Sequence, residues 1–428
     1  MVYDKVYDIP MDILKLQSLL KKQFNENYYT PKELEYGNAA GVFLSPFEYK
    51  EFLEYKDSIA SPDNPAVKSL PLPSFNYPHL YFSLGKDFSS LLDSYALLKD
   101  EDTDLLDRFS FSFTQSRIYS EIEGSLNVEN VPTTRRRLKE LLEENAPAQD
   151  KNDVIIKNMK AAIDFVHQLP EFNDDNLFKL YSLLSAGCLG EDEKLRLDEH
   201  YRYDGVEISH YHGCPAWRIQ ESMDALFLFA QDVLQGKDLT MRVLLPHICH
   251  YYLLYIHPYF DFNGRTARMV SYWIYLLSGI QGFAPIVSEA INQTKADYYR
   301  AIENSRDAHN DLTYFLKYLL SVSIDYFICY QNLSHLKQEG MKRGIILTET
   351  ELNYVKRILI SYHGPFTFGA FLKMANVAMS KQGALKLLNR FVDYGILKEM
   401  ENPSRNKLFD VNGKAIPFSL KQFGYKNR

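Results

Sequence analysis

The chain has 428 residues, of which 46% are hydrophobic and 24% charged, a composition typical of a globular protein with room for several domains. Its four cysteines, Cys188, Cys214, Cys249 and Cys329, form no Cys-x-x-Cys pair, which argues against a disulfide framework and a thiolate zinc site. The sequence contains no run of about 18 apolar residues, so no membrane span is predicted, and the N-terminus resembles no secretion signal. We therefore expect a cytoplasmic protein without a membrane partner.

The net charge of −7 hides an uneven distribution along the chain. From Met341 to Arg428 there are 15 Lys and Arg against 6 Asp and Glu, a net charge of +9, which leaves −16 for the rest. A basic terminal domain beside an acidic body indicates that this segment has partners of its own.

The N-terminal part is expected to be helical, with one interruption. Amphipathic patterns predict helices at Met11 to Phe24 and Pro46 to Tyr55. Five prolines between Ser61 and Pro78 predict a boundary or an extended strap instead of a regular element. Helical patterns return at Asp87 to Asp104 and at Asp107 to Ile122, where Gly124 is placed to follow the helix end.

The stretch from His257 to Arg268 lies between two apolar, helix-like runs. Pro258 disfavours helical backbone at His257 and predicts a short loop. Asn263 is a favourable N-cap, and Gly264 allows close backbone approach. A helix that starts there directs free N–H groups at the loop and predicts an anion-binding site.

The side chains of this stretch favour chemistry on a nucleotide. Arg265 and Arg268 are three residues apart, so their guanidinium groups share a helix face and suit a polyphosphate. Asp261 offers the carboxylate oxygen that Mg²⁺ prefers beside phosphate, and His257 can take a proton near neutral pH. The combination predicts phosphoryl or nucleotidyl transfer from a Mg-nucleotide to a hydroxyl group.

The same stretch resembles the signature of the Fic family, His-Pro-Phe-x-(Asp/Glu)-Gly-Asn-Gly-Arg-x-x-Arg, whose members mostly transfer AMP from ATP to a Ser, Thr or Tyr hydroxyl of a target protein. The sequence departs from the signature at Tyr259 and, more severely, at Phe262, where the family has glycine. The resemblance implies a role for each matching residue: His257 as general base, Asp261 as the Mg²⁺ ligand, and Asn263, Gly264, Arg265 and Arg268 as the phosphate-binding residues.

A second, partial resemblance concerns inhibition. Ser120-Glu-Ile-Glu-Gly124 resembles the inhibitory motif (Ser/Thr)-x-x-x-Glu-(Gly/Asn) of Fic proteins with an N-terminal inhibitory helix, although Tyr119 occupies the Ser/Thr position. The resemblance implies that Glu123 pairs with Arg268 and blocks the outer phosphate site. The alternative is a solvated carboxylate at a helix end.

Two further segments resemble parts of the Fic substrate site. Val206, Glu207, Ile208 and Ser209 alternate as in a strand, and they resemble the β-hairpin flap on which a target segment is positioned. Tyr298 and Tyr299 resemble a segment in which one tyrosine lines the nucleotide base pocket. A plain surface hairpin and two core aromatics are the alternatives.

The basic C-terminal segment has the pattern of three helices followed by a two-stranded hairpin, which predicts a winged helix-turn-helix. The recognition helix would begin at Ser380. The +9 charge favours a phosphate footprint, but winged helices also dock proteins. The candidate DNA contacts are Lys381, Gln382, Lys386 and Arg390.

We therefore predict a mainly α protein with an N-terminal helical region and strap (1–84), a Fic-domain helical bundle with a β-hairpin flap (85–337, inhibitory helix 107–123) and a winged helix-like domain (345–428). The predicted function is a protein adenylyltransferase that uses ATP and Mg²⁺ and is autoinhibited by Glu123. Its expected partners are a target protein, itself as a target, DNA and a second copy in a homodimer. The alternatives are a DNA-binding regulator whose Fic domain senses nucleotide, and a Fic enzyme with AMP-removing or other phosphotransfer activity.

Overall fold

A computed structural model describes residues 12–25, 27–36, 41, 44–95, 111–208, 211–362, 364–375, 380–401 and 407–416. The chain divides into two compact units, Met1–Val322 and Ser323–Arg428, and helix α14 (Thr313–Lys342) runs through the division. Within the described residues no helix combines the length and apolarity that a membrane crossing requires.

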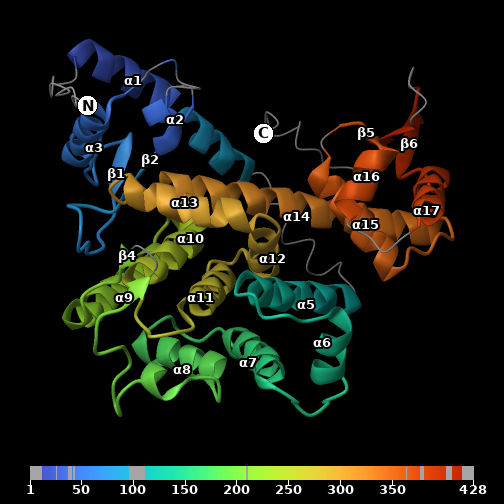
Figure 1. The fold of residues 1–428 in the computed structure, drawn as a ribbon, viewed down its shortest axis with the longest axis horizontal. Coiled ribbons are helices and arrows are strands. Elements are labelled where there is room, and N and C mark those ends of the chain that lie inside the picture. The colour runs from blue at the N-terminus through green and yellow to red at the C-terminus, as the bar shows by residue number, and fades with distance from the viewer. Residues whose placement is uncertain are drawn as a thin grey trace, which may run out of the picture. The chain divides into compact units, whose positions relative to one another are not determined.

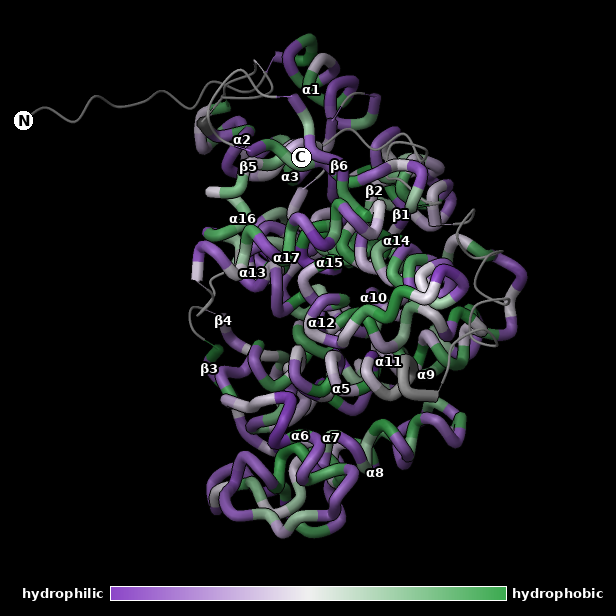
Figure 2. The backbone as a smooth tube through the Cα atoms, turned by 90° about the vertical axis from the view of Figure 1, so that its right-hand side faces the viewer, coloured by the Kyte–Doolittle hydropathy of each residue, from purple (hydrophilic) through white to green (hydrophobic). Residues whose placement is uncertain are grey.

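Two helices form the centre of the first unit, α10 (Leu239–Ile256) and α11 (Asn263–Leu277), and they pack against each other (Figure 1). From Val243 to Leu253 every residue of α10 is buried, and Figure 2 shows hydrophobic stretches along this helix. A helix without a polar face has to be covered on all sides. The loop that joins α10 to α11 is the His257 stretch, so a rigid core holds both of its ends.

Three helices cover α10 and α11, and two of them start at a side-chain cap. Asp150 caps α7 (Lys151–Val166), and Asn173 caps α8 (Asp174–Ser185). The capping oxygens accept the free N–H groups of each first turn. The third helix, α9 (Ile219–Gln235), follows the short 3-10 helix η2 (Ala216–Arg218) and packs against α10.

Helix α5 (Phe111–Val128) packs along the short helix α12 (Val287–Gln293), which follows the 3-10 helix η3 (Gln281–Ile286) (Figure 1). The prediction that Gly124 ends this helix is wrong, because α5 continues for four residues beyond it. Gly124 is buried against the backbone of α12, so it serves close helix approach instead of termination. The predicted start at residues 107–110 lies outside the described residues.

The described residues of the N-terminal region form three helices, α1 (Ile13–Asn25), α2 (Pro31–Tyr36) and α3 (Pro46–Ile59). A reciprocal capping box between Ser45 and Glu48 starts α3. The Pro-rich strap is more regular than predicted, because β1 (Val67–Ser69) pairs antiparallel with β2 (Tyr81–Ser83). Residues 86–95 are helical, and the rest of the helix predicted to Asp104 lies outside the described residues.

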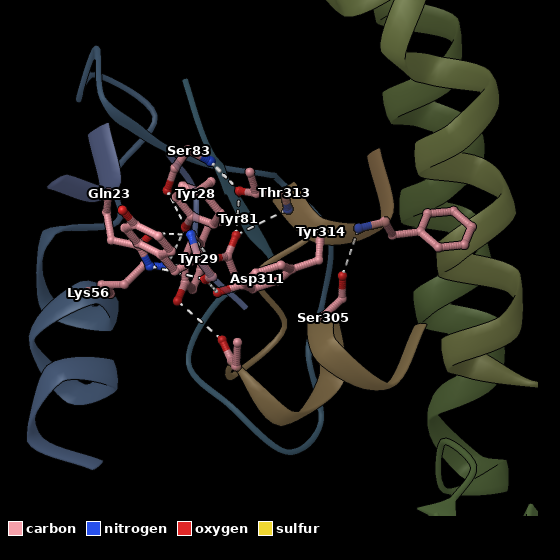
Figure 3. A network of polar contacts seen from close by, with 12 residues as sticks. Gln23, Tyr28, Tyr29, Lys56, Tyr81, Ser83, Ser305, Asp311, Thr313 and Tyr314 are labelled. Carbon is pink, nitrogen blue, oxygen red and sulfur yellow. Dashed lines mark hydrogen bonds and ion pairs between the residues drawn. The ribbon is translucent and has the colours of Figure 1, made fainter. Parts of the chain in front are cut away.

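A buried polar network fastens this region to the loop before α14 (Figure 3). Lys56 of α3 is 1% exposed and forms an ion pair with the fully buried Asp311. Tyr28 donates to the same carboxylate and lies 3.0 Å from Ser83 Oγ. A buried charge needs such a partner, because desolvation of an unpaired ion costs several kcal/mol.

The remaining elements of the first unit include the hairpin β3 (Glu207–Ile208) and β4 (Tyr211–His212), with Glu207 opposite His212. Ser209 lies outside the described residues. The bounds of the other elements are α6 Arg135–Leu142, η1 Glu191–Glu193 and α13 Lys295–Asp307.

In its described residues, the second unit contains the C-terminal part of α14, three further helices and a three-stranded sheet with the order β5-β7-β6. Leu397 of β6 pairs with Val411 of β7, and Phe366 of β5 pairs with Phe409 of β7. The predicted turn at 402–406 and residues 417–428 lie outside the described part. In chain order the elements are α15 Glu349–Ser361, β5 Phe366–Thr367, α16 Phe368–Ala375, α17 Lys381–Asp393, β6 Leu397–Met400 and β7 Leu408–Val411.

Candidate functional site

The candidate site begins where α10 ends. His257 is the C-cap residue, with left-handed backbone (φ 55°, ψ 62°), and its N–H donates to Leu253 O at 2.9 Å. Pro258 disfavours right-handed helix at the residue before it, so the predicted break occurs at this position. The chain then turns away from the helix axis, and the imidazole is held at the edge of the core.

Asn263 holds the loop closed. Its side-chain Oδ1 accepts the N–H of Tyr259 at 3.0 Å, and its Nδ2 donates to Tyr259 O at 2.8 Å. The Tyr259 ring stacks on Tyr181 at 3.6 Å with nearly parallel planes. The side chain of Asn263 thus shapes the loop, and only its backbone N–H remains for an anion.

The predicted N-cap role of Asn263 is wrong by one residue, because Phe262 is the N-cap and Asn263 is the first residue of α11. Phe262 adopts left-handed backbone (φ 65°, ψ 6°), where glycine is favoured, and its side chain provides no cap. The ring is 2% exposed, and the guanidinium of Arg265 lies 3.5 Å from its centroid. This packing explains how a large side chain is kept at a position that suits glycine.

Asp261 is the exposed acid of the loop, with 43% of its side chain accessible. Its Oδ1 accepts the N–H of Phe262 at 2.6 Å and lies 3.8 Å from Arg265 Nη2. Within the described residues Oδ2 has no hydrogen-bond partner. An accessible carboxylate oxygen beside a phosphate-binding surface suits Mg²⁺.

The two arginines of α11 are buried cations with different partners. Burial lowers the pKa of Arg265, and its Nε has no hydrogen-bond partner among the described residues. Arg268 is 1% exposed; its Nε donates to Ser125 Oγ at 3.0 Å and its Nη2 to Ser125 O at 3.1 Å. Unpaired buried donors are costly, so Arg265 is prepared for an anionic ligand.

A carboxylate of the chain itself lies against Arg268 at the start of α11. Glu129 Oε1 accepts Arg268 Nη2 at 2.8 Å, and it lies so close to Gly264 that a Cβ there would collide with it. Burial opposes ionisation of Glu129, yet the charge of Arg268 holds the pKa of Glu129 below its usual value. Burial likewise works against the charge of Arg268, and Glu129 raises the pKa of Arg268 above its ordinary value.

The predicted pairing of Glu123 with Arg268 is therefore wrong. Glu123 Oε2 lies 3.9 Å from Arg135 Nη1, and 34% of its side chain is exposed. Ser120 also faces Arg135, at 3.5 Å, and Gly124 contacts α12. Because α5 continues past Gly124, the carboxylate that reaches Arg268 comes from the following turns.

The sequence contained the signal for Glu129. Ser125-Leu-Asn-Val-Glu129-Asn130 fits (Ser/Thr)-x-x-x-Glu-(Gly/Asn) without a mismatch, and its glutamate lies six residues after Glu123. Asn130 accepts a hydrogen bond from Lys295 Nζ at 2.8 Å, and Lys295 adds positive charge near Glu129.

His257 is poised as a neutral base. Burial lowers its pKa to about 4, a hydrogen bond with the Leu254 backbone raises it, and the nearby charge of Arg202 lowers it. Arg202, which the sequence did not single out, donates from Nε to His257 O at 2.7 Å, and its N–H donates to Pro258 O at 2.9 Å. A neutral imidazole can accept a proton at any pH above its pKa.

The hairpin lies beside this histidine. Gly213 N–H donates to Val206 O at 3.1 Å, and a Cβ on Gly213 would lie 3.4 Å from His257 Cβ. Glu207 is exposed and Ile208 is half-buried, so the β3 strand is accessible. The role of Val206 to Ser209 as a target-docking flap stays a prediction.

The two tyrosines of α13 have separate environments. Tyr298 is 2% exposed, and its hydroxyl lies 2.9 Å from His250 Nε2, which makes it part of the core. Tyr299 is 42% exposed, and burial and then Glu129 raise its pKa. Of the two candidates for the base pocket, only Tyr299 combines an accessible ring with proximity to the arginine site.

In the second unit, Lys381, Gln382 and Lys386 of α17 are exposed. Arg390 is exposed as well, but its Nη1 pairs with Glu351 at 3.0 Å and its Nε donates to Tyr394 at 2.7 Å. The first three residues can therefore contact a ligand without breaking an internal contact.

Residues 171–275, which include the whole loop from His257 to Arg268, match the Fic/DOC family. The "Protein adenylyltransferase Fic" of Nematostella vectensis is 22% identical over 299 residues, 64% of each chain, so this chain spans less than two thirds of that relative. The "Protein adenylyltransferase fic-1" of Caenorhabditis elegans is 36% identical over 72 residues, 17% of this chain and 13% of that protein. A solved Fic family protein from Desulfovibrio desulfuricans G20 superimposes with a TM-score of 0.49 at 17% identity, covering 79% of this chain and 99% of that one. This chain thus carries a Fic domain with low-identity relatives named as transferases.

Proposed function

We propose that this protein transfers AMP from ATP to a Ser, Thr or Tyr hydroxyl of a protein target. The observation that carries the proposal is the loop between α10 and α11, which places His257, Asp261 and two buried arginines around the start of one helix. A helix start with two guanidinium groups binds phosphates, and an imidazole beside it can activate a hydroxyl.

The reaction is an in-line substitution at the α-phosphorus of ATP. The target oxygen forms a bond to phosphorus, the bond to the bridging oxygen of pyrophosphate breaks, and His257 accepts the hydroxyl proton. Arg265 and Arg268 bind the outer phosphates, and Tyr299 stacks on the base. Mg²⁺, when bound, offsets charge on the leaving pyrophosphate, and the accessible carboxylate of Asp261 would hold it.

We further propose that Glu129 inhibits the enzyme. A phosphate of ATP and the Glu129 carboxylate require the same Nη2 of Arg268, so they exclude each other. The bond of 2.8 Å, the burial of Arg268 and the close contact with Gly264 support this assignment. The proposed inhibitory residue is therefore Glu129 instead of Glu123.

The test compares labelling of the protein itself by ATP carrying the label at the α- or the γ-phosphate. Glu129→Gly should increase α-label incorporation by tenfold or more, and adding His257→Ala should abolish it. Glu123→Gly is the matched control, because it removes the same type of side chain six residues earlier, on α5, and should leave labelling unchanged. Transfer of γ-label instead would identify a phosphotransferase, and equal labelling by the Glu129 and Glu123 variants would exclude inhibition by Glu129.

A second proposal concerns the C-terminal unit, which we infer to be a winged helix that binds DNA. Its order of helix, strand, two helices and two strands and its exposed α17 lysines support this proposal. Lys381→Ala with Lys386→Ala should weaken binding of a fluorescent DNA duplex and reduce its salt dependence, whereas Lys373→Ala on α16 should have little effect. Identical binding by all variants would leave α17 without a DNA role.

A further inference from the structure

Helix α5 and the turn that directly follows it present four polar side chains to the body of the first unit at a spacing of four residues. They are Arg117, Glu121, Ser125 and Glu129, which we call the polar seam. Residues four apart lie on one helix face. Arg117, Glu121 and Ser125 are 4%, 1% and 0% exposed, so the seam is buried along most of its length.

The four members of the polar seam contact three different elements. Arg117 donates to Gly282 O in η3. Glu121 Oε2 accepts the N–H of Ser288, in α12, at 2.9 Å. The other two members both bind Arg268 of α11, as described above. Polar contacts with η3, α12 and α11 therefore define the position of α5 in the first unit.

Gly124 lies between these contacts at the closest approach of α5 to α12. A Cβ on Gly124 would lie 2.6 Å from Glu289 N and 2.7 Å from Glu289 Cα. These are backbone atoms of a buried helix, so they cannot rotate away as a side chain would. The distance between α5 and α12 thus depends on the absence of a side chain at residue 124.

We propose that Gly124 and Glu121 are positioning residues that set the depth of α5 on α12 and thereby hold Glu129 on Arg268. The proposal rests on the proposed inhibition by Glu129 and extends it, because it assigns the control of inhibition to a helix contact distant from the nucleotide. Lifting α5 would free Arg268 while Glu129 itself remains unchanged. Any partner or modification that separates α5 from α12 would then activate the enzyme.

The geometry predicts that Gly124→Ala weakens the contact between Glu129 and Arg268. Alanine is a better helix former than glycine, so Gly124→Ala leaves α5 itself intact and changes only its distance from α12. The Glu129 carboxylate makes one bond of 2.8 Å to Arg268, and a displacement of about 1 Å would exceed hydrogen-bonding range. A small outward shift of α5 is therefore sufficient to break the inhibitory contact.

Hydrogen exchange of the peptide spanning residues 116–130 tests the position of α5 without reference to activity. Gly124→Ala should increase its exchange rate tenfold or more over the wild type. The matched control is Gly369→Ala in α16, where a Cβ would have only an ordinary contact of 3.9 Å with Thr367 Oγ1. Unchanged exchange in the Gly124 variant would overturn the proposal.

Self-labelling by ATP tests whether the position of α5 on α12 controls inhibition. Gly124→Ala should raise incorporation of α-label towards the level of Glu129→Gly, and the double variant should add nothing further. Labelling of Glu129→Gly with no gain for Gly124→Ala would overturn the proposal. If neither variant is labelled but exchange rises in Gly124→Ala, the position of α5 is supported and the adenylyltransferase assignment fails.

Glu121 supplies a second, independent variant in case Gly124→Ala does not fold. Glu121→Ala removes the acceptor of Ser288 N–H and should also accelerate exchange, whereas Glu121→Gln retains an acceptor oxygen and should behave as the wild type. A thermal unfolding curve for each variant establishes that the rest of the chain is folded. Equal exchange for the alanine and glutamine variants would contradict the role of Glu121.

Discussion

At the scale of single residues, the loop from His257 to Arg268 was predictable because its chemistry is local. The break before Pro258, the pair of arginines and the acid Asp261 follow from the order of residue types and from steric rules. Arg202 was not predictable in this way. It reaches His257 from 55 positions away, and only the folded chain brings the two together.

Phe262 gives a prediction about stability at this scale. Phe262→Gly relieves left-handed backbone worth about 1–2 kcal/mol, but it removes a buried ring worth about 3–5 kcal/mol. We therefore expect a net loss of about 2 kcal/mol in the free energy of unfolding, measured by urea denaturation. An increase in stability would show that the contact of the ring with Arg265 contributes little.

Tyr259, in the same loop, is a position where a substitution should not lower stability. Its hydroxyl is buried and has no hydrogen-bond partner among the described residues. Tyr259→Phe removes that unsatisfied group and keeps the ring on Tyr181, so stability should stay the same or rise by about 1 kcal/mol. The same urea titration measures it, and a clear loss would reveal a partner for the hydroxyl.

At the scale of elements, helices with a strong amphipathic pattern were predicted within a few residues, as α1 and α3 show. The errors occurred where a distant partner decides the local structure. Gly124 lies inside a helix because α12 passes close by, and β1 forms within a Pro-rich strap because β2 pairs with it. Neither partner is visible in the local pattern that predicted a helix end and an irregular strap.

The polar seam also predicts a pH dependence. Burial is the main reason that the pKa of Glu121 is raised to about 7; its hydrogen bonds with Ser288 oppose this rise, as does the charge of Arg268, and Glu289 adds to it. Once α5 is lifted into solvent, the pKa of Glu121 should return to about 4.3. Between about pH 4.3 and pH 7, Glu121 is therefore protonated when α5 is packed on α12 and ionised when α5 is lifted away.

The sign follows from proton linkage. The free energy that holds α5 against α12 is most favourable below about pH 4.3. It weakens by up to about 1.4 kcal/mol per pH unit as pH rises to 7, and it is constant above pH 7. The labelling activity of the wild type divided by that of Glu129→Gly should therefore rise between pH 5 and 7 and then level off. The ratio cancels the titration of His257, and Glu121→Gln should make it flat. A ratio that falls with pH would contradict the account.

At the scale of the whole molecule, the mainly helical class followed from composition and pattern. The attachment of the N-terminal region did not, because Lys56 and Asp311 are far apart in sequence. A lysine on an amphipathic helix predicts an exposed charge. Only the cluster of Tyr28 and its neighbours around Lys56 makes its burial tolerable.

Removal of this lysine should therefore destabilise the first unit. Lys56→Met leaves Asp311 buried without its cation, and we expect a loss of about 3–5 kcal/mol in the free energy of unfolding. Lys50→Met on the same helix is the control, because Lys50 pairs with Glu54 at 3.7 Å on an exposed surface and should change stability by less than about 1 kcal/mol. Equal effects in denaturant unfolding would show that the buried pair does not anchor the region.

The central claim is that the Glu129 carboxylate occupies the guanidinium of Arg268 that a phosphate of ATP requires. Titration calorimetry of Mg-ATP binding tests it without a target protein. The account predicts that Glu129→Gly binds at least tenfold more tightly than the wild type, while Glu123→Gly binds as the wild type does. Equal affinity for all three proteins, or a gain with Glu123→Gly alone, would contradict it.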